Sequence, residues 1–138
     1  MLAIPILLIS AICKSAYNGD FTTVWDSISI WLVLNSVLTG LGVMIARGHP
    51  VSIIVGALAS PITSLNPTIA AGWFAGYTQL KIVPPTGKDA SDFLEFPSFF
   101  NMFFRNKVGR VIMVTALGNI GSTAGTFLAA GIISYGLI

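Results

Sequence analysis

The sequence predicts an all-α integral membrane protein with about four hydrophobic segments. Hydrophobic residues make up 54% of the 138 residues and charged residues only 9%, whereas a soluble domain carries roughly 25% charged residues. The apolar residues form long runs interrupted by Gly, Pro, Ser and Thr, and they lack the charged faces of amphipathic soluble helices. We therefore expect a single multi-pass domain over residues 1–138 in the cell membrane, with the lipid bilayer as its partner.

The first two hydrophobic segments cover about residues 1–16 and 25–46. The first differs from a signal peptide because no charged region precedes it and no cleavage-like site leads into a soluble domain. We interpret it as a span, and because a crossing needs about 20 apolar residues, its shortness suggests that it continues a longer chain. The second segment reaches full length and carries Trp25 and Trp31 toward one end, as expected at a membrane interface.

The third hydrophobic segment, residues 51–80, is interrupted at residues 60–66 by a run of polar side chains. Pro61 lies in this run and Pro67 directly follows it. Each proline removes a backbone donor and disfavours helix in the residue before it. We therefore expect a discontinuous segment with an unwound loop at its centre.

Two residue pairs mark the expected helix starts in this segment. His49 and Pro50 precede it, and we assign His49 a turn or capping role rather than chemistry. Asn66 stands directly before a proline, and Asn caps orphan N–H groups while Pro is tolerated at the first helical position. The prediction is two half-helices, over residues 51–59 and 67–80.

The polar loop is the best candidate for a functional site. Its binding groups would be Ser60, Thr63, Ser64 and Asn66. Irregular backbone at membrane depth is tolerated only beside protein or a hydrated cavity, and broken helices form the ion and substrate sites of many transporters. A small channel or transporter is therefore one hypothesis, and the alternative is that these groups satisfy one another inside the bundle. Asn35 and Asn119 are expected to form interhelical hydrogen bonds.

An interfacial amphipathic segment is expected over residues 89–105. Six of the nine phenylalanines fall between residues 93 and 104, and Pro97 divides the segment. The phenylalanines would lie at the headgroup boundary while the acidic residues face water. The basic residues that follow are expected to contact lipid headgroups: Arg105, Lys107 and Arg110.

The fourth hydrophobic segment covers about residues 111–137. Small residues recur on one face of the expected helix at Gly118, Ser122 and Gly125, and Gly121 adds a Gly-x-x-x-Gly pair. Small residues let two helix backbones approach closely. We therefore expect a close helix–helix contact there, and a homo-oligomer formed through this segment.

Catalysis by this chain is not expected, because acid–base pairs and metal sites need clustered His, Cys, Asp or Glu. The chain has one His, one Cys and five acidic residues, and the acidic residues fall outside the hydrophobic segments or, for Asp26, at the end of one. We predict no catalytic residue, no metal and no cofactor. Nucleic acid is not an expected partner either, because the seven basic residues are spread along the chain and form no binding face.

The basic residues also predict orientation. Five of the seven lie between residues 81 and 110, so the positive-inside rule places that stretch in the cytoplasm. If the third segment returns to the side it left, Arg47 joins these five, and if it crosses, Lys14 joins them instead. Charge alone does not choose between the two, but residues 51–59 cover only about half of a 30 Å hydrocarbon core, which favours the re-entrant form.

Two stretches carry a family resemblance. The first comprises His49-Pro50-Val51-Ser52 and then Ala59-Ser60-Pro61-x-Thr63-Ser64-Leu65-Asn66-Pro67. The second comprises Phe104-Arg105-Asn106-Lys107 and then Ala116-Leu117-Gly118-Asn119-x-Gly121-Ser122. Together they resemble the C-terminal membrane region of the TraB (pheromone-shutdown) family, particularly its archaeal members.

The resemblance implies a longer protein with a soluble N-terminal domain, in which Gly-x-x-His motifs and a Glu are proposed to form a metal-dependent hydrolase site. This chain departs from that pattern, because Ala46 stands where the motif before His49 would need Gly. We therefore expect this chain to anchor and position a catalytic domain that it does not itself contain. The family is linked to inhibition of peptide-pheromone signalling in bacteria.

Overall fold

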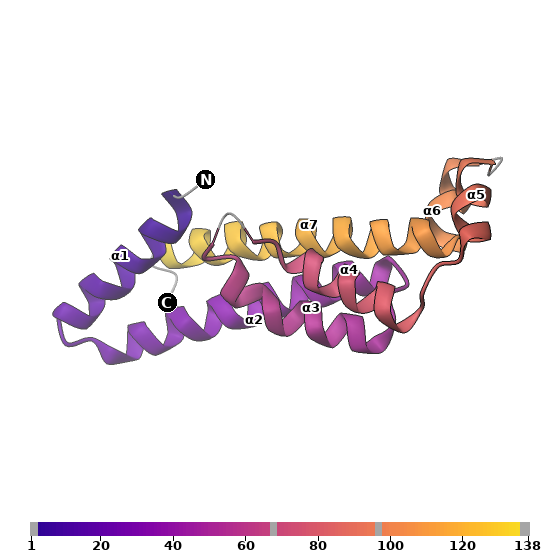
Figure 1. The fold of residues 1–138 in the computed structure, drawn as a ribbon. Helices are drawn as coiled ribbons and strands as arrows, with labels where there is room; N and C mark the ends of the chain where they lie inside the picture. Colours follow the sequence, from indigo (N-terminus) through magenta and orange to yellow (C-terminus); the bar gives the residue numbers. More distant parts are fainter. Residues whose placement is uncertain (1–2, 67–68, 96–97, 136–138) are drawn as a thin grey trace.

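The computed structural model describes residues 3–66, 69–95 and 98–135, and in these residues every regular element is a helix, which confirms the predicted all-α class. The helices are α1 (Ala3–Tyr17), α2 (Phe21–Ile45), α3 (Pro50–Thr63), α4 (Ala71–Ile82), α5 (Gly87–Glu95), α6 (Phe99–Arg105) and α7 (Lys107–Ser134). They form an elongated bundle with α1 at one end and α5 and α6 at the other (Figure 1).

The axis of the bundle is an antiparallel pair, α2 and α7. Both helices are long and apolar enough to cross a membrane. Glycines of α7 lie directly on the backbone of α2: a Cβ on Gly121 would collide with the carbonyl oxygen of Leu38, and one on Gly125 would lie 2.8 Å from that of Leu34. This close approach is what small residues on a helix face permit.

The α3 and α4 helices form an antiparallel hairpin along α2 and α7 (Figure 1). The start of α3 lies beside the end of α4, since the backbone N–H of His49 donates to Oε1 of Gln79 at 2.6 Å. Farther along the pair, a Cβ on Gly56 would lie 3.0 Å from the Cβ of Ala75. The hairpin therefore returns to the end of the bundle at which it began.

The predicted break in this segment was wrong by about four residues. The first helix does not stop at Ala59 but continues through Pro61 to Thr63, and the second begins at Ala71. Hydroxyls donate to carbonyls near the end of this helix, that of Thr63 to the Ala59 carbonyl and that of Ser64 to the Pro61 carbonyl. Pro61 itself removes one N–H, whose acceptor in the helix would be the carbonyl of residue 57. Pro67 lies outside the described residues.

The predicted interfacial segment is two short helices, α5 and α6, packed against the start of α7. Gly109 of α7 lies so close to the backbone of Met102 that a Cβ would collide with its carbonyl oxygen. The rings of Phe93 and Phe103 meet edge to face with their centroids 5.8 Å apart, and those of Phe100 and Phe104 stack at 4.5 Å. The prediction of Phe96 at the boundary and a break at Pro97 concerns residues outside the described part.

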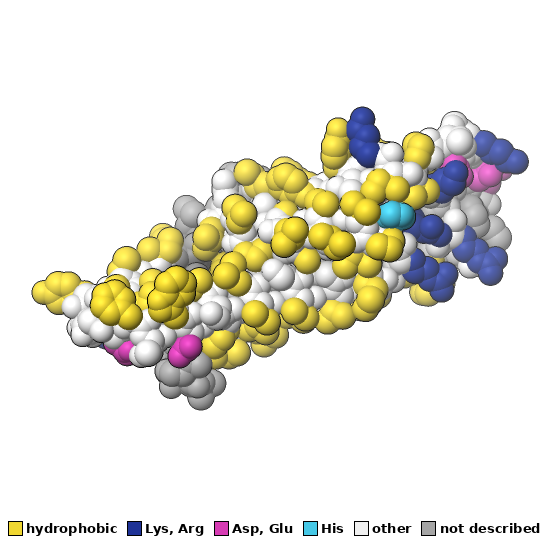
Figure 2. Space-filling model, turned by 90° about the horizontal axis from the view of Figure 1, so that it is seen from below, with side chains coloured by type: hydrophobic (Ala, Val, Ile, Leu, Met, Phe, Trp, Pro, Cys, Tyr) yellow, Lys and Arg dark blue, Asp and Glu magenta, His cyan; other side chains and the backbone are white. Residues whose placement is uncertain are grey.

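Polar side chains lie inside this bundle and large apolar side chains lie on its surface, the reverse of a soluble protein. In the described residues, buried polar or charged residues number nine and buried hydrophobic residues seven. Large apolar side chains instead face outward along the bundle, among them Leu58, Ile62 and Ile120, each more than half exposed. Figure 2 shows hydrophobic side chains spread along the length of one face, with Lys and Arg gathered at one end.

Candidate functional site

The centre of the bundle holds a chain of hydrogen-bonded hydroxyl groups from three helices. Ser60 of α3 is fully buried, and its Oγ accepts from Oγ1 of Thr39 on α2 at 2.6 Å. The same hydroxyl donates to Oγ of Ser122 on α7 at 2.9 Å. The three hydroxyls therefore satisfy one another and tie the hairpin to the α2–α7 pair.

A second set of hydrogen bonds lies along the interface between α2 and α7. The hydroxyl of Thr126 is within hydrogen-bond distance of two acceptors, the Ser122 carbonyl at 2.9 Å and Oδ1 of Asn35 at 3.1 Å. The amide of Asn35 donates to the Trp31 carbonyl at 3.0 Å. The indole N–H of Trp31 in turn donates to the Pro61 carbonyl at 3.2 Å. A buried network in which each member has a partner specifies one packing arrangement. Asn35 thus bonds both within α2 and across to α7.

The four predicted binding residues do not converge on a common point. Ser60 lies in the hydroxyl chain, while Thr63 and Ser64 donate to carbonyls of their own helix. Asn66 is exposed at the beginning of the loop that follows α3. Ser60, Thr63 and Ser64 thus bond to different groups of the protein and do not form a common site.

The cap of α4 comes from a different residue than predicted. The helix begins after Ala70, which offers no side-chain cap, so Asn66 is not the N-cap. Instead Oδ1 of Asn119, on α7, accepts from the backbone N–H of Gly72 at 2.7 Å. The first N–H groups of a helix have no partner within it, so a cap supplied by another helix replaces a local one. The sequence marked Asn119 as a polar residue in an apolar helix but could not indicate its target.

A second buried amide joins the two ends of the hairpin. Gln79 of α4 is 2% exposed, and its Oε1 accepts from the His49 backbone N–H and from Oγ of Ser52 at 3.2 Å. His49 is the N-cap of α3, with Pro50 at the first helical position, and its Nδ1 accepts from the Val51 N–H at 3.3 Å. Sequence reasoning missed Gln79, although a Gln near the end of an apolar segment was a possible signal.

The small-residue face of α7 is occupied within the chain. Gly118 faces the backbone of Gly72 in α4, and Gly121 and Gly125 face α2. The expected close helix contact therefore lies within the chain. The homo-oligomer stays a prediction.

Charge is concentrated at the end of the bundle where the hairpin begins and ends. Arg105 ends α6, and Lys107 and Arg110 open α7. Lys107 lies 3.8 Å from Asp89 of α5. Hydrogen bonds from the backbone N–H and then the hydroxyl of Thr86 hold the pKa of the Asp89 carboxyl below its ordinary value, and Lys107 adds to this. Asn106 caps α7 and also donates to the Asp89 carbonyl at 2.7 Å.

Neutral hydrogen-bonding groups make up the centre of the bundle. In the part of the chain that the structure describes, no group of three His, Cys, Asp or Glu residues could hold a metal ion. The central network contains hydroxyls, amides, an indole and backbone carbonyls, and no ionisable group is among its members.

Comparison with known proteins identifies the family. Residues 1–138 match the family described as TraB family protein, C-terminal domain. An uncharacterised protein of Methanocaldococcus jannaschii is 34% identical over 103 residues, which cover 73% of this chain and 26% of that protein. The chain thus spans about a quarter of the length of its curated relative. No solved structure matches it. The chain belongs to the TraB family and corresponds to that family's C-terminal domain.

Proposed function

We propose that this chain is a multi-pass membrane domain that anchors the remainder of a TraB-family protein. The observation that carries the proposal is the inverted burial of its two long helices. In the most apolar stretch of α2 only 33% of the residues are buried, and in that of α7 only 17% are buried. An apolar helix at the core of a soluble protein is mostly buried, so these outward surfaces favour contact with lipid.

The spans in this proposal are α2 and α7, with the α3–α4 hairpin as a re-entrant element. The 25 residues of α2 measure about 37 Å, enough for a 30 Å hydrocarbon core, whereas the 14 residues of α3 measure about 21 Å. Since the hairpin ends lie together, α3 enters from one side and α4 returns to it. The hydroxyl chain at its inner end satisfies polar groups that lipid could not.

The basic end of the bundle would face the cytoplasm. A returning hairpin puts Arg47 at the same end as the five basic residues between 81 and 110, and leaves Lys14 at the other. The positive-inside rule then favours this orientation. Arg105, Lys107 and Arg110 would contact lipid headgroups there, beside the exposed rings of Phe99 and Phe100.

In this proposal the domain neither catalyses a reaction nor transports a solute. The hydroxyls that would bind a solute at Ser60 and Thr63 donate to groups of the protein itself. The chain also lacks the Gly-x-x-His motif on which the family's proposed hydrolase site depends. The role left to this domain is to hold and orient a soluble domain, and any enzymatic activity would lie in that other part of a longer protein.

Cysteine labelling from the two sides of the membrane tests the topology. With Cys13→Ser as background, single cysteines at Tyr17, which is 92% exposed, and at Lys88 should react from opposite sides. We expect Lys88→Cys to react from the cytoplasm. Reaction of both positions from the same side would refute the re-entrant arrangement, and extraction of the chain by alkaline carbonate would refute anchoring itself.

A further inference from the structure

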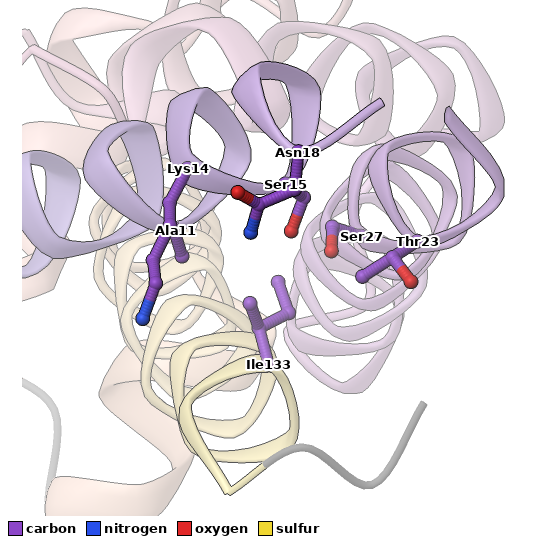
Figure 3. A pocket seen from close by; sticks show the side chains of 7 residues that line it. All are labelled: Ala11, Lys14, Ser15, Asn18, Thr23, Ser27 and Ile133. Atoms are coloured by element: carbon purple, nitrogen blue, oxygen red, sulfur yellow. The ribbon is translucent and has the colours of Figure 1, made fainter. Parts of the chain in front are cut away.

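A polar pocket opens between α1, α2 and α7 (Figure 3). It lies at the end of the bundle opposite Arg105, Lys107 and Arg110. Its volume is about 250 Å³, smaller than the roughly 300–1,000 Å³ of sites for drug-sized ligands. The polar residues that line it are Lys14, Ser15, Asn18, Thr23 and Ser27, with Ala11 and Ile133 as apolar neighbours. A pocket of this size suits a compact polar group.

Several of these side chains are available to a ligand. Ser27 is 3% exposed, but its side chain lines the pocket, and its hydroxyl makes no hydrogen bond with a described residue. A hydroxyl on the wall of a pocket can bond to a ligand or to water. The ammonium group of Lys14 likewise forms no ion pair with a described carboxylate. The pocket therefore offers an unpaired cation and a hydroxyl that can bond to a ligand.

The charges around the pocket favour an anionic group. Two carboxylates, Asp20 and Asp26, lie in this part of the chain, and neither lines the pocket. Asp20 is committed to the start of α2, where it accepts from the hydroxyls of Thr22 and Thr23 and from the Thr23 N–H. It thereby caps the positive end of that helix dipole. Lys14 remains the one ionisable residue lining the pocket. Together with the amide of Asn18, it presents several N–H donors, which phosphoryl oxygens accept well.

The depth of the pocket matches that of lipid headgroups. Lys14 lies in the last turn of α1, and Ser27 stands six residues, or about 9 Å, beyond the first residue of α2. Exposed apolar side chains border this end, including Ile9 at 52%, Phe21 at 64% and Trp25 at 67%. Acyl chains could lie on this surface while the headgroup occupies the pocket.

We propose that this pocket binds the phosphate group of a phospholipid in the leaflet opposite the basic end. Lys14 and Asn18 would donate to the phosphoryl oxygens, and Ser27 would bond to a further headgroup oxygen. The proposal rests on the membrane location proposed above. It adds a specific lipid site that anchoring by the apolar surface alone does not require.

Lipid binding by the whole chain in a neutral detergent tests this site. The probes are phosphatidylglycerol, diacylglycerol as a phosphate-free lipid, and inorganic phosphate, followed by native mass spectrometry. We expect saturable binding of phosphatidylglycerol. Lys14→Gln should weaken it about tenfold, equivalent to about 1.4 kcal/mol and the loss of one charge-assisted hydrogen bond. Lys88→Gln removes the same charge from an exposed residue of α5 and should change affinity less than about twofold.

Substitution of Ser27 tests the lipid site independently of Lys14. Ser27→Val and the smaller Ser27→Ala should each weaken binding about threefold without changing the helical content. Equal effects of Lys14→Gln and Lys88→Gln, or equal binding of diacylglycerol, would overturn the proposal. Inorganic phosphate that binds with the same dependence on Lys14 would overturn the lipid as the source. Alkaline extraction of Lys14→Gln separates the two proposals, because loss of the lipid site should leave the chain in the membrane.

Discussion

Replacement of Asn119 by Ala should destabilise α4, although Asn119 lies in α7, 47 residues after its partner Gly72. Oδ1 of Asn119 is the acceptor for the Gly72 N–H, at 2.7 Å, and Gly72 is buried. The variant leaves that N–H without a partner. A lost cap costs about 1 kcal/mol in water, but an unsatisfied buried group costs about 1–3 kcal/mol. We expect a loss of about 2 kcal/mol in the free energy of unfolding, which for a chain of this size lowers the melting temperature by about 7 °C.

The measurement combines melting by circular dichroism with amide hydrogen exchange, both in detergent. Amide exchange should accelerate most in the first turn of α4, which starts at Ala71, because without the cap this turn opens more often. Ile120→Ala is the matched control, since the neighbouring side chain is 62% exposed and should contribute little. An Asn119→Ala variant that melts within about 2 °C of the unmodified protein would refute the capping role.

A second substitution at Asn119 tests whether water reaches the start of α4. Asn119→Asp keeps an acceptor for the Gly72 N–H but brings a charge to the depth of the hairpin. In a dry interior the buried carboxylate should destabilise the fold more than Asn119→Ala does, despite the favourable helix N-terminus. A variant more stable than Asn119→Ala would show that water reaches the inner end of α4.

Three further changes test other parts of the bundle. Gly125→Leu should disturb folding, because a Cβ would already lie 2.8 Å from a carbonyl of α2, whereas the outward Ile112→Leu should not; equal melting temperatures in detergent would contradict this packing. Ser60→Val should lower the free energy of unfolding by about 1–3 kcal/mol, because two buried hydroxyls lose their common partner, and an unchanged steric-trapping stability would refute it. The lowered pKa of Asp89 means that its stabilising effect is full above the ordinary value of 3.8 and is lost as pH falls through the lower folded-state value. Asp89→Asn should therefore abolish that pH dependence of hydrogen exchange in α5, and an unchanged dependence would contradict it.

The sequence by itself determined the all-helical class and the family. Long apolar runs with few charges require helices in which every backbone group is satisfied, and that argument needs no tertiary contact. The motif around His49 and Pro61 led to the TraB resemblance, which the family match over residues 1–138 confirms. The small residues from Gly118 to Gly125 likewise predicted a close helix contact, because close approach depends only on which residues share a face.

Only the tertiary structure decided which groups meet across the bundle. Local rules expected the helix to break at Pro61 and Asn66 to cap its continuation. Instead α3 continues through Pro61 to Thr63, and Asn119 of a distant helix caps α4. The same face of α7 that suggested a second copy of the chain packs on α2 and α4. Propensity and capping preferences describe a segment and its immediate neighbours, whereas these hydrogen bonds join residues 47 to 91 positions apart and depend on how the helices are placed in space.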